Sequence, residues 1–203
     1  MARRFSGQPR GLHAPPCDVF FVGTGFPERR ALFGGVDWTG IDFQQKGFLW
    51  SDEEQADTLM PRDVTANADV TAFYRSAKIN LNHHRTTTIY DQDVHIDPAS
   101  AESLGPRAYE IAACGGFQLC DDSRAELSDV FGDAIATYRA GDSADLERQI
   151  RYWLDHPTER AEKARAQYQA VRPHTWAARA SGVLSILSAV RDQQRADRAI
   201  VVS

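Results

Sequence analysis

Charged residues cluster around the start of one short helix, which the sequence predicts between Gly105 and the pair Gly115–Gly116. Pro106 suits the first turn because the N–H that it lacks would have no partner inside the helix, and the two glycines end the helix. A helix N-terminus carries a partial positive charge and unpaired N–H groups, which attract anions. Arg107 can add charge-assisted hydrogen bonds to a phosphate, and Glu110, one turn on, can accept hydrogen bonds from sugar hydroxyls. These residue types predict a site for a diphosphate.

The elements around this helix are expected to form an α/β sheet. Val19–Val22 is a continuous apolar run, typical of a parallel strand buried on both faces, and residues 78–82 form a later strand. Strands and helices alternate, which implies a Rossmann-like parallel sheet with right-handed crossovers and helices on both faces. The loops at Gly23, at Asn82 and at residues 102–105 then lie at carboxyl ends of strands, where such sheets bind ligands.

Later segments give further structural predictions. Asp121–Ser123 is expected to cap the helix that follows it. Residues 176–190 carry apolar side chains at helical spacing and are predicted to form the last helix. Tyr138, Trp153 and Trp176 are interpreted as aromatic residues of the core or of helix packing.

Three blocks of the sequence resemble one group of enzymes. The spacing Glu102–x7–Glu110 before an Ala-Cys-Gly turn resembles the donor-site motif of retaining GT-B glycosyltransferases. The string RAYEIAACGGFQL at 107–119 is closer to the spore-maturation-protein-like branch of the group 1, family 4-like, glycosyltransferases. Residues 18–30 and 74–83 resemble the same branch. The blocks follow one another in the order of that family, and the resemblance covers most of the chain.

The resemblance implies the C-terminal, donor-binding half of a GT-B enzyme, which transfers a sugar from a nucleotide-diphosphate sugar to an acceptor. Neither a metal ion nor another cofactor is expected. The donor-binding residues that we predict are Gly23, Thr24, Gly25, Asn82, Ser103, Leu104, Gly105, Arg107 and Glu110. The predicted catalytic residues are Glu102 and His84, of which His84 would hydrogen-bond the transferred sugar.

Each of these residues also has a simpler interpretation. Glu110 could be a surface glutamate of an amphipathic helix, and Arg107 could pair with the acidic residues at 121–122. The spacing of seven residues between Glu102 and Glu110 could arise by chance. His84 could be a solvated loop residue.

The segment from residue 83 to 101 is polar and predicts little regular structure. Asp91, Asp93, His95 and Asp97 alternate in it, so an extended chain would place four metal-ligand types on one edge. A metal-dependent enzyme built on residues 83–97 is therefore an alternative function. Short acidic patterns are common in polar loops, and we expect no metal site.

Composition excludes several classes of protein. The chain has 203 residues, a net charge of −5 and a pI near 5.7, which argues against nucleic acid as a partner. No apolar run is long enough for a membrane span. Cys17, Cys114 and Cys120 are odd in number and indicate reduced thiols in a cytoplasmic protein. Glu28 stands where a dinucleotide fingerprint would have its third glycine, which disfavours an NAD site.

The predicted organisation is a flexible leader or linker remnant at 1–17, a nucleotide-sugar-binding domain at 18–190 and a tail at 191–203. An acceptor domain is not recognised, so the chain could be a fragment, pair with an acceptor-domain partner, self-associate or bind nucleotide sugar without turnover. The last possibility, a non-catalytic nucleotide-sugar-binding or partner-docking domain, is a second alternative function. An uncovered apolar surface is expected at 176–190 or at Trp38, Phe48, Leu49 and Trp50.

Overall fold

A computed structural model describes residues 14–50, 67–85 and 101–201 of the chain. Its centre is a five-stranded parallel sheet with the strand order β2-β1-β3-β4-β5. The strands are β1 (Val19–Val22), β2 (Phe43–Lys46), β3 (Ile79–Asn82), β4 (Gln118–Asp121) and β5 (Ala136–Tyr138). The Rossmann-like α/β fold predicted from the sequence is confirmed.

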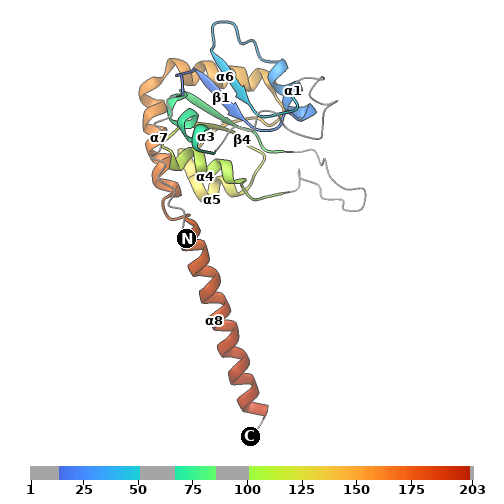
Figure 1. The fold of residues 1–203 in the computed structure, drawn as a ribbon, viewed down its shortest axis with the longest axis vertical. Helices are drawn as coiled ribbons and strands as arrows, with labels where there is room; N and C mark the ends of the chain where they lie inside the picture. The colour runs from blue at the N-terminus through green and yellow to red at the C-terminus, as the bar shows by residue number, and fades with distance from the viewer. Residues whose placement is uncertain (1–13, 51–66, 86–100, 202–203) are drawn as a thin grey trace, which may run out of the picture.

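Helices cover both faces of this sheet (Figure 1). One face packs against α1 (Pro27–Gly34) and α6 (Ser143–Asp155), and the other against α3 (Asn67–Ser76), α4 (Pro106–Ala113) and α5 (Glu126–Phe131). The 3₁₀ turn η2 (Gly132–Ala134) follows α5, and α7 (Pro157–Val171) packs along α4 and α5. The sheet is thus the middle layer of three.

Alternation along β1 divides the core between the two faces. Phe21 packs with Phe33 of α1 and lies in the same apolar cluster as Leu146 of α6. Phe20 points to the opposite face, where its ring stacks on Phe73 of α3 with centroids 4.6 Å apart. Fully burying one such side chain contributes about 1.5–3 kcal/mol. The continuous apolar run therefore has a physical cause, since both faces of β1 are covered.

Several helix boundaries follow the sequence signals. Pro27 and Pro106 stand in the first turns of α1 and α4, and the Asp142 carboxylate caps α6 by accepting a hydrogen bond from the Asp145 N–H at 2.9 Å. The expected cap at Asp121–Ser123 is wrong. α5 begins at Glu126, and its N-cap is Ala125, whose side chain has no hydrogen-bond acceptor. The Asp121 carboxylate instead accepts hydrogen bonds from His84 and Ser123.

The strand order reverses between β1 and β3. From β1 the chain crosses to β2 on one side, and the later strands are added on the other side. The loops that leave β1 and β3 therefore diverge to opposite faces and leave a crevice at the carboxyl ends of the two strands. In open parallel sheets, ligands bind at such a switch point.

Two tryptophans that we expected on an uncovered surface are instead packed in the molecule. The Trp38 ring stacks on Phe43 with centroids 3.9 Å apart. Trp50 stacks on Phe33 at 5.8 Å, and its indole N–H donates to the Gly23 carbonyl at 3.1 Å. Of the expected group, Phe48 is 41% exposed. Aromatic packing against β1 and β2 explains the correction, because it buries large apolar areas at the sheet edge.

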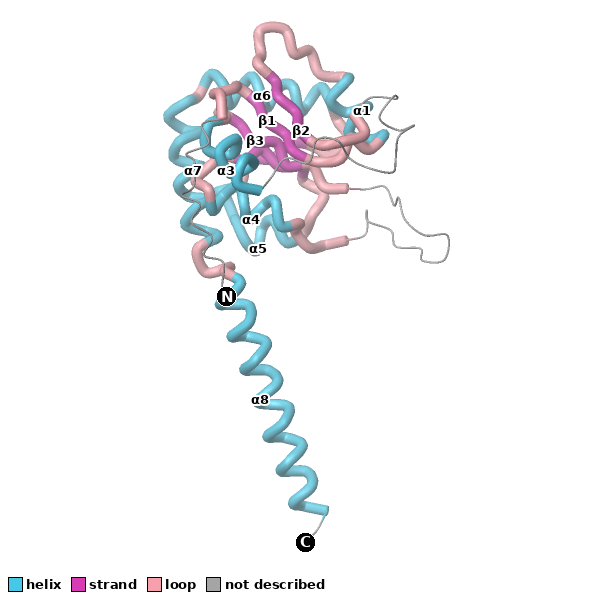
Figure 2. Tube along the Cα trace, viewed as in Figure 1, coloured by secondary structure: helices cyan, strands magenta, loops and turns pink. Residues whose placement is uncertain are grey.

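The last helix, α8 (Trp176–Val201), projects from the body (Figures 1 and 2). It runs past the end predicted near residue 190. Trp176 is 83% exposed, so its assignment to the core or to helix packing is wrong for this structure. The exposed apolar side chains that we expected on this helix are present at Val183, Leu184, Ile186, Leu187 and Val190. Among the described helices, none is long and apolar enough to cross a membrane.

Candidate functional site

A cavity of about 430 Å³ lies at the switch point between β1 and β3. Six of the predicted site residues line it, namely Gly23, Asn82, His84, Gly105, Arg107 and Glu110. They come from three separate segments: the end of β1, the end of β3 and the start of α4. The convergence predicted from the strand order is therefore present in the fold.

Two arginines supply the positive charge of this cavity. The guanidinium of Arg29, a buried residue of α1, donates to the Thr24 carbonyl at 3.0 Å and to the His83 carbonyl at 2.8 Å. Arg107 of α4 donates to the same His83 carbonyl at 3.5 Å. Both guanidinium carbons lie over the Phe21 ring, at 5.3 and 4.9 Å from its centroid. The His83 carbonyl and the Phe21 ring thus hold two cationic groups side by side.

This pairing of like charges is costly in the absence of an anion. Burial, and then repulsion from Arg107, lower the pKa of Arg29 to about 10. The side chain still carries its charge at neutral pH. An anion that contacts both guanidinium groups would relieve the repulsion, so the geometry favours a phosphate or diphosphate.

Two glycines of the β1–α1 loop serve different purposes. A Cβ on Gly23 would lie 2.7 Å from Nη2 of Arg107, so this glycine leaves room for the arginine. A Cβ on Gly25 would lie 2.5 Å from the Leu49 carbonyl oxygen. Gly25 therefore permits the loop after β2 to pack closely, and it does not line the cavity.

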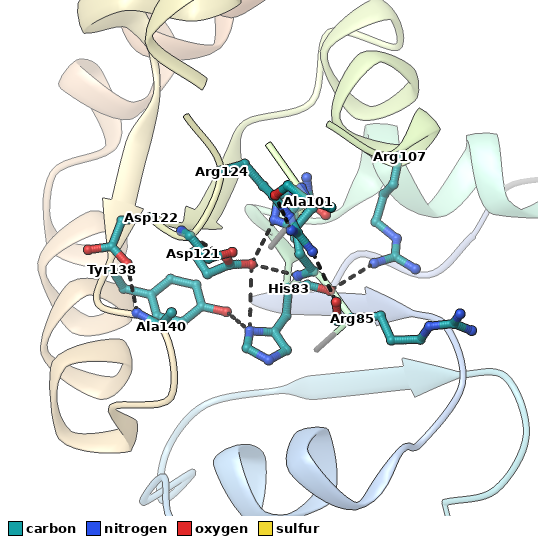
Figure 3. A network of polar contacts seen from close by, with 12 residues as sticks. His83, Arg85, Ala101, Arg107, Asp121, Asp122, Arg124, Tyr138 and Ala140 are labelled. Atoms are coloured by element: carbon teal, nitrogen blue, oxygen red, sulfur yellow. Dashed lines mark hydrogen bonds and ion pairs between the residues drawn. The ribbon is translucent and has the colours of Figure 1, made fainter. Parts of the chain in front are cut away.

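Two adjacent histidines, His83 and His84, follow β3 and form a buried polar network with β4 and β5. Figure 3 shows His83 beside Tyr138 and Asp121. His83 Nδ1 lies 2.9 Å from the Tyr138 hydroxyl, and burial lowers the pKa of His83 to about 4, so the ring is neutral at physiological pH. His84 makes two contacts to Oδ2 of Asp121, from its backbone N–H at 2.6 Å and from Nδ1 at 2.9 Å. Ser123 N–H donates to the other carboxylate oxygen at 3.1 Å.

Asp121 keeps its negative charge in this buried position. Burial alone would raise its pKa, but the hydrogen bond and the charge of His84, together with Ser123, lower the pKa well below its ordinary range. Four N–H or hydroxyl groups of His84 and Ser123 contact the Asp121 carboxylate, and such contacts stabilise its charged form. Asp121 is therefore a fixed acceptor that holds His84 in place.

A chain of amides positions Asn82. Its Nδ2 group donates to Oε1 of Gln118 at 3.3 Å, and the Gln118 side chain donates in turn to the Ala108 carbonyl at 2.9 Å. Gln167 of α7 accepts from the Gln118 backbone N–H at 3.0 Å. This network links the end of β3 to α4 and α7, and it fixes the orientation of the Asn82 amide.

Hydrogen bonds connect the segment before α4 to the start of α5. The Leu104 N–H donates to Oε2 of Glu126 at 2.6 Å, and the Glu126 N–H donates to the Glu102 carbonyl at 3.1 Å. Arg124 donates to the Ala101 carbonyl and, at 3.0 Å, to the Arg85 carbonyl (Figure 3). These bonds fix the direction from which the chain enters α4, and so place Arg107.

Five predicted residues do not line the cavity. Thr24 contributes its carbonyl to Arg29, and Gly25 supports the neighbouring loop. Glu102 and Ser103 are exposed, whereas Leu104 is buried in the apolar cluster beneath α4 and α5. Their assigned roles stay predictions.

The alternative pairing of Arg107 with Asp121 or Asp122 is not found among the described residues. Asp121 bonds His84 and Ser123, and Asp122 accepts from the Ala140 N–H at 2.9 Å. His84 is buried, so its interpretation as a solvated histidine is wrong. The Glu110 side chain is exposed at the edge of the cavity.

The candidate metal ligands Asp91, Asp93, His95 and Asp97 lie outside the described residues. Within the described part, the ligand atoms of His84, Cys120 and Asp121 lie within 4.8 Å of one another. This group fits a metal poorly. Burial raises the pKa of the Cys120 thiol well above its ordinary value, and a thiol binds metal as the thiolate. The Asp121 oxygen nearest His84 is already hydrogen-bonded.

A larger cavity of about 600 Å³ lies near the amino-terminal ends of β3 and β4, against α7. Its cationic residues include Lys78 and Arg160. Lys78 pairs with Asp18 at 2.7 Å, and Arg160 donates to the Trp153 and Leu154 carbonyls. These cations are engaged within the protein, and parallel sheets bind ligands at the opposite strand ends. The switch-point cavity is therefore the better candidate site.

Sequence reasoning missed two residues of the site. Arg29 was part of an ordinary helix in the sequence, and Asp121 was assigned to a helix cap. Arg29 did carry a usable signal, because it lies one helical turn after a Gly-x-Gly loop at a strand end. The partnership of Asp121 with His84 depends on tertiary contacts and had no local signal.

The chain belongs to the glycosyl transferase-like family, whose model matches residues 26–185. A search of curated proteins gives no match. Among solved structures, the fold is similar to sucrose-phosphate synthase from Thermosynechococcus elongatus, with a TM-score of 0.58 and 14% identity. That similarity covers 87% of this chain and 46% of the other, so this chain spans about half of that enzyme.

Two further structures are similar over 81% of this chain. They are apo OtsA, with a TM-score of 0.45, 10% identity and 42% of that chain covered, and AviGT4, a glycosyltransferase involved in avilamycin A biosynthesis, with 0.41, 14% and 50%. Their scores are too low to carry an argument. Family and fold together support the GT-B glycosyltransferase class, and the spore-maturation-protein-like branch stays a prediction.

Proposed function

We propose that this chain is the donor-binding part of a glycosyltransferase and that the switch-point cavity binds the diphosphate of a nucleotide sugar. The observation that carries the proposal is the convergence of Arg29 and Arg107 on one carbonyl at the β1/β3 switch point. The family of the chain supports a nucleotide sugar as the ligand.

Each part of the cavity matches one part of such a ligand. The two guanidinium groups and the N-terminus of α4 suit the diphosphate. The exposed carboxylate of Glu110, one turn into α4, is placed to accept hydrogen bonds from sugar or ribose hydroxyls. In sugar transfer the diphosphate leaves with its charge, and fixed cations stabilise that charge.

Transfer also requires an acceptor held in line with the donor. We propose that an acceptor domain faces the carboxyl edge of the sheet, either in the same longer polypeptide or as a partner. The exposed apolar side chains of α8 are a candidate contact for it. In this proposal the chain binds the donor, and the complete enzyme, which includes the acceptor domain, transfers the sugar.

Thermal unfolding in the presence of nucleoside diphosphates tests the proposal. At 100 times the dissociation constant, a ligand that binds only the folded state adds about 2.7 kcal/mol of stability. We expect UDP, GDP or a related diphosphate to raise the melting temperature without a divalent ion. A shift that requires Mn²⁺ would favour a metal-dependent site, and no shift with any diphosphate would reject the donor-domain function.

A further inference from the structure

The larger cavity, of about 600 Å³, has the size of a small-molecule site and carries positive charge. Its walls come from the ends of α3 and α4 and from one face of α7. Four cationic side chains line it, and none of its described lining residues is acidic. The whole chain has a net charge of −5, so this concentration of positive charge is local. A hollow lined by one sign of charge attracts ligands of the opposite sign.

Two of the four cations have no partner within the described part of the chain. Lys78 pairs with Asp18, and Arg160 donates to two backbone carbonyls. Arg75, in the last turn of α3, and Arg165, on α7, make no hydrogen bond or ion pair with the described residues. The charge of Arg75 suits a helix C-terminus, but this accounts for neither Arg165 nor the concave shape. Two unpaired guanidinium groups at one cavity can together bind a doubly charged anion such as a phosphate.

The rest of the wall fits the organic part of a ligand. Tyr168 presents a ring that is 42% exposed. The side chains beside it are apolar at Phe117, Ala113, Ala161 and Ala164, and the three alanines are too small to fill the volume. An aromatic ring and alkyl groups bind the body of a small molecule, whereas inorganic phosphate has no apolar part to contact them. The cavity therefore favours an organic phosphate over the inorganic ion.

Cys114 reports on this cavity from its wall. The thiol is half-buried, and burial raises its pKa, while the nearby charge of Arg75 acts in the opposite direction. The charge of Arg75 thus lies close to this wall. Cys17 and Cys120, the other two cysteines of the chain, are buried. Cys114 is therefore the thiol that a reagent can reach and that a bound ligand can cover.

We propose that this cavity is a second ligand site, which binds an organic phosphate through Arg75 and Arg165 and packs the apolar or aromatic part of that molecule on Tyr168. The site lies near the opposite strand ends from the switch-point cavity and does not depend on the proposed function. α4 contributes to both cavities, with Arg107 at the one and Ala113 at the other. The test must therefore separate the two sites.

The probe is phenyl phosphate, and inorganic phosphate and phenol represent its two parts. Calorimetric titrations use the wild type, Arg107→Gln and the double variant Arg75→Gln/Arg165→Gln. The control is Arg172→Gln/Arg191→Gln, which removes the same charge at exposed positions outside both cavities. Alkylation of Cys114 by iodoacetamide, measured by mass spectrometry with and without phenyl phosphate, locates the bound probe.

We expect phenyl phosphate to bind the wild type and Arg107→Gln, more tightly than either inorganic phosphate or phenol, and to protect Cys114. The double variant Arg75→Gln/Arg165→Gln should bind about tenfold or more weakly, because charge-assisted hydrogen bonds are lost, while its melting temperature stays nearly unchanged. The control should bind as the wild type does. Tyr168→Ala should reduce the affinity toward that of inorganic phosphate.

Three results would overturn the inference: no binding of phenyl phosphate by Arg107→Gln, equal affinities of the two double variants, or binding that leaves Cys114 fully reactive. The first result, with binding kept in the wild type, would assign the anion to the switch-point cavity. None of the three concerns nucleoside diphosphate binding, so this inference can fail while the proposed function stands.

Discussion

Replacing Arg107 by glutamine removes one of the two cations at the proposed diphosphate site. Its hydrogen bond to the His83 carbonyl is long, at 3.5 Å, and its contact with the Phe21 ring is worth about 0.5–1 kcal/mol. We therefore expect Arg107→Gln to lower the free energy of unfolding by less than about 1 kcal/mol. A charge-assisted hydrogen bond to phosphate contributes about 1.5–3 kcal/mol. Nucleoside diphosphate affinity should accordingly fall about 10- to 150-fold.

Isothermal titration of UDP and GDP into wild type and Arg107→Gln measures this loss, and urea unfolding measures the stability. Arg172→Gln is a control with the same change of charge, because Arg172 is exposed at the end of α7 and lines neither of the two cavities. Both proteins have the same net charge, so a general electrostatic effect would weaken binding equally. An affinity for Arg107→Gln equal to that of the control would refute the assignment of Arg107 to the diphosphate.

Three more predictions follow from the same contacts. Glu110→Gln should weaken nucleotide-sugar binding in calorimetry and leave the melting temperature nearly unchanged, since its side chain is exposed; an unchanged affinity would contradict the ligand role. Gly23→Ala should displace the Arg107 guanidinium and thereby weaken diphosphate binding. Wild-type affinity in this variant would show that binding does not depend on the position of that guanidinium. Stability should fall by about 2 kcal/mol between pH 7 and pH 5 in urea titrations. The cause is His83, whose pKa of about 4 in the folded protein lies below its ordinary value of 6.5, so only the unfolded chain takes up a proton in this window. His83→Gln should flatten that dependence.

The sheet could be predicted because its signals are local. β1 and β3 are short apolar or amide-bearing runs, each followed by glycine or polar residues, and β1 is covered on both faces. Pro27, Pro106 and Asp142 mark helix starts by backbone geometry alone. Because the sheet is parallel, the three loops that we predicted to bind a ligand could be placed at one edge of the sheet without knowledge of any side-chain contact.

The parts of the site that could not be predicted depend on tertiary contacts. Asp121 looked like a helix cap because acidic residues favour that position, but a bond to the end of the neighbouring strand β3 determines its role. Arg29 is buried because two carbonyls from different loops face it. Trp50 is not part of a periodic pattern, yet ring contacts with Phe21 and Phe33 and a hydrogen bond to the Gly23 carbonyl bury it partly. Contacts between residues that are distant in the sequence leave no pattern in the local sequence.

The sequence predicted that the last helix, α8, would carry an uncovered apolar face. Its apolar residues recur at helical spacing, which indicates a helix that packs on something, and the described part of the body does not cover Leu184 or Leu187. Sequence pattern reports that such a face needs a partner, and it does not identify the partner. An acceptor domain remains our proposal for this face.

The central claim is that the switch-point cavity binds the diphosphate of a nucleotide sugar through Arg29 and Arg107. The most direct measurement is a calorimetric titration of the wild-type chain with nucleoside diphosphates in a buffer containing EDTA. The account predicts saturable binding with one site per chain, and a parallel titration of Arg107→Gln with a dissociation constant at least about tenfold higher. Absence of binding by every diphosphate, or binding that EDTA abolishes, would contradict it.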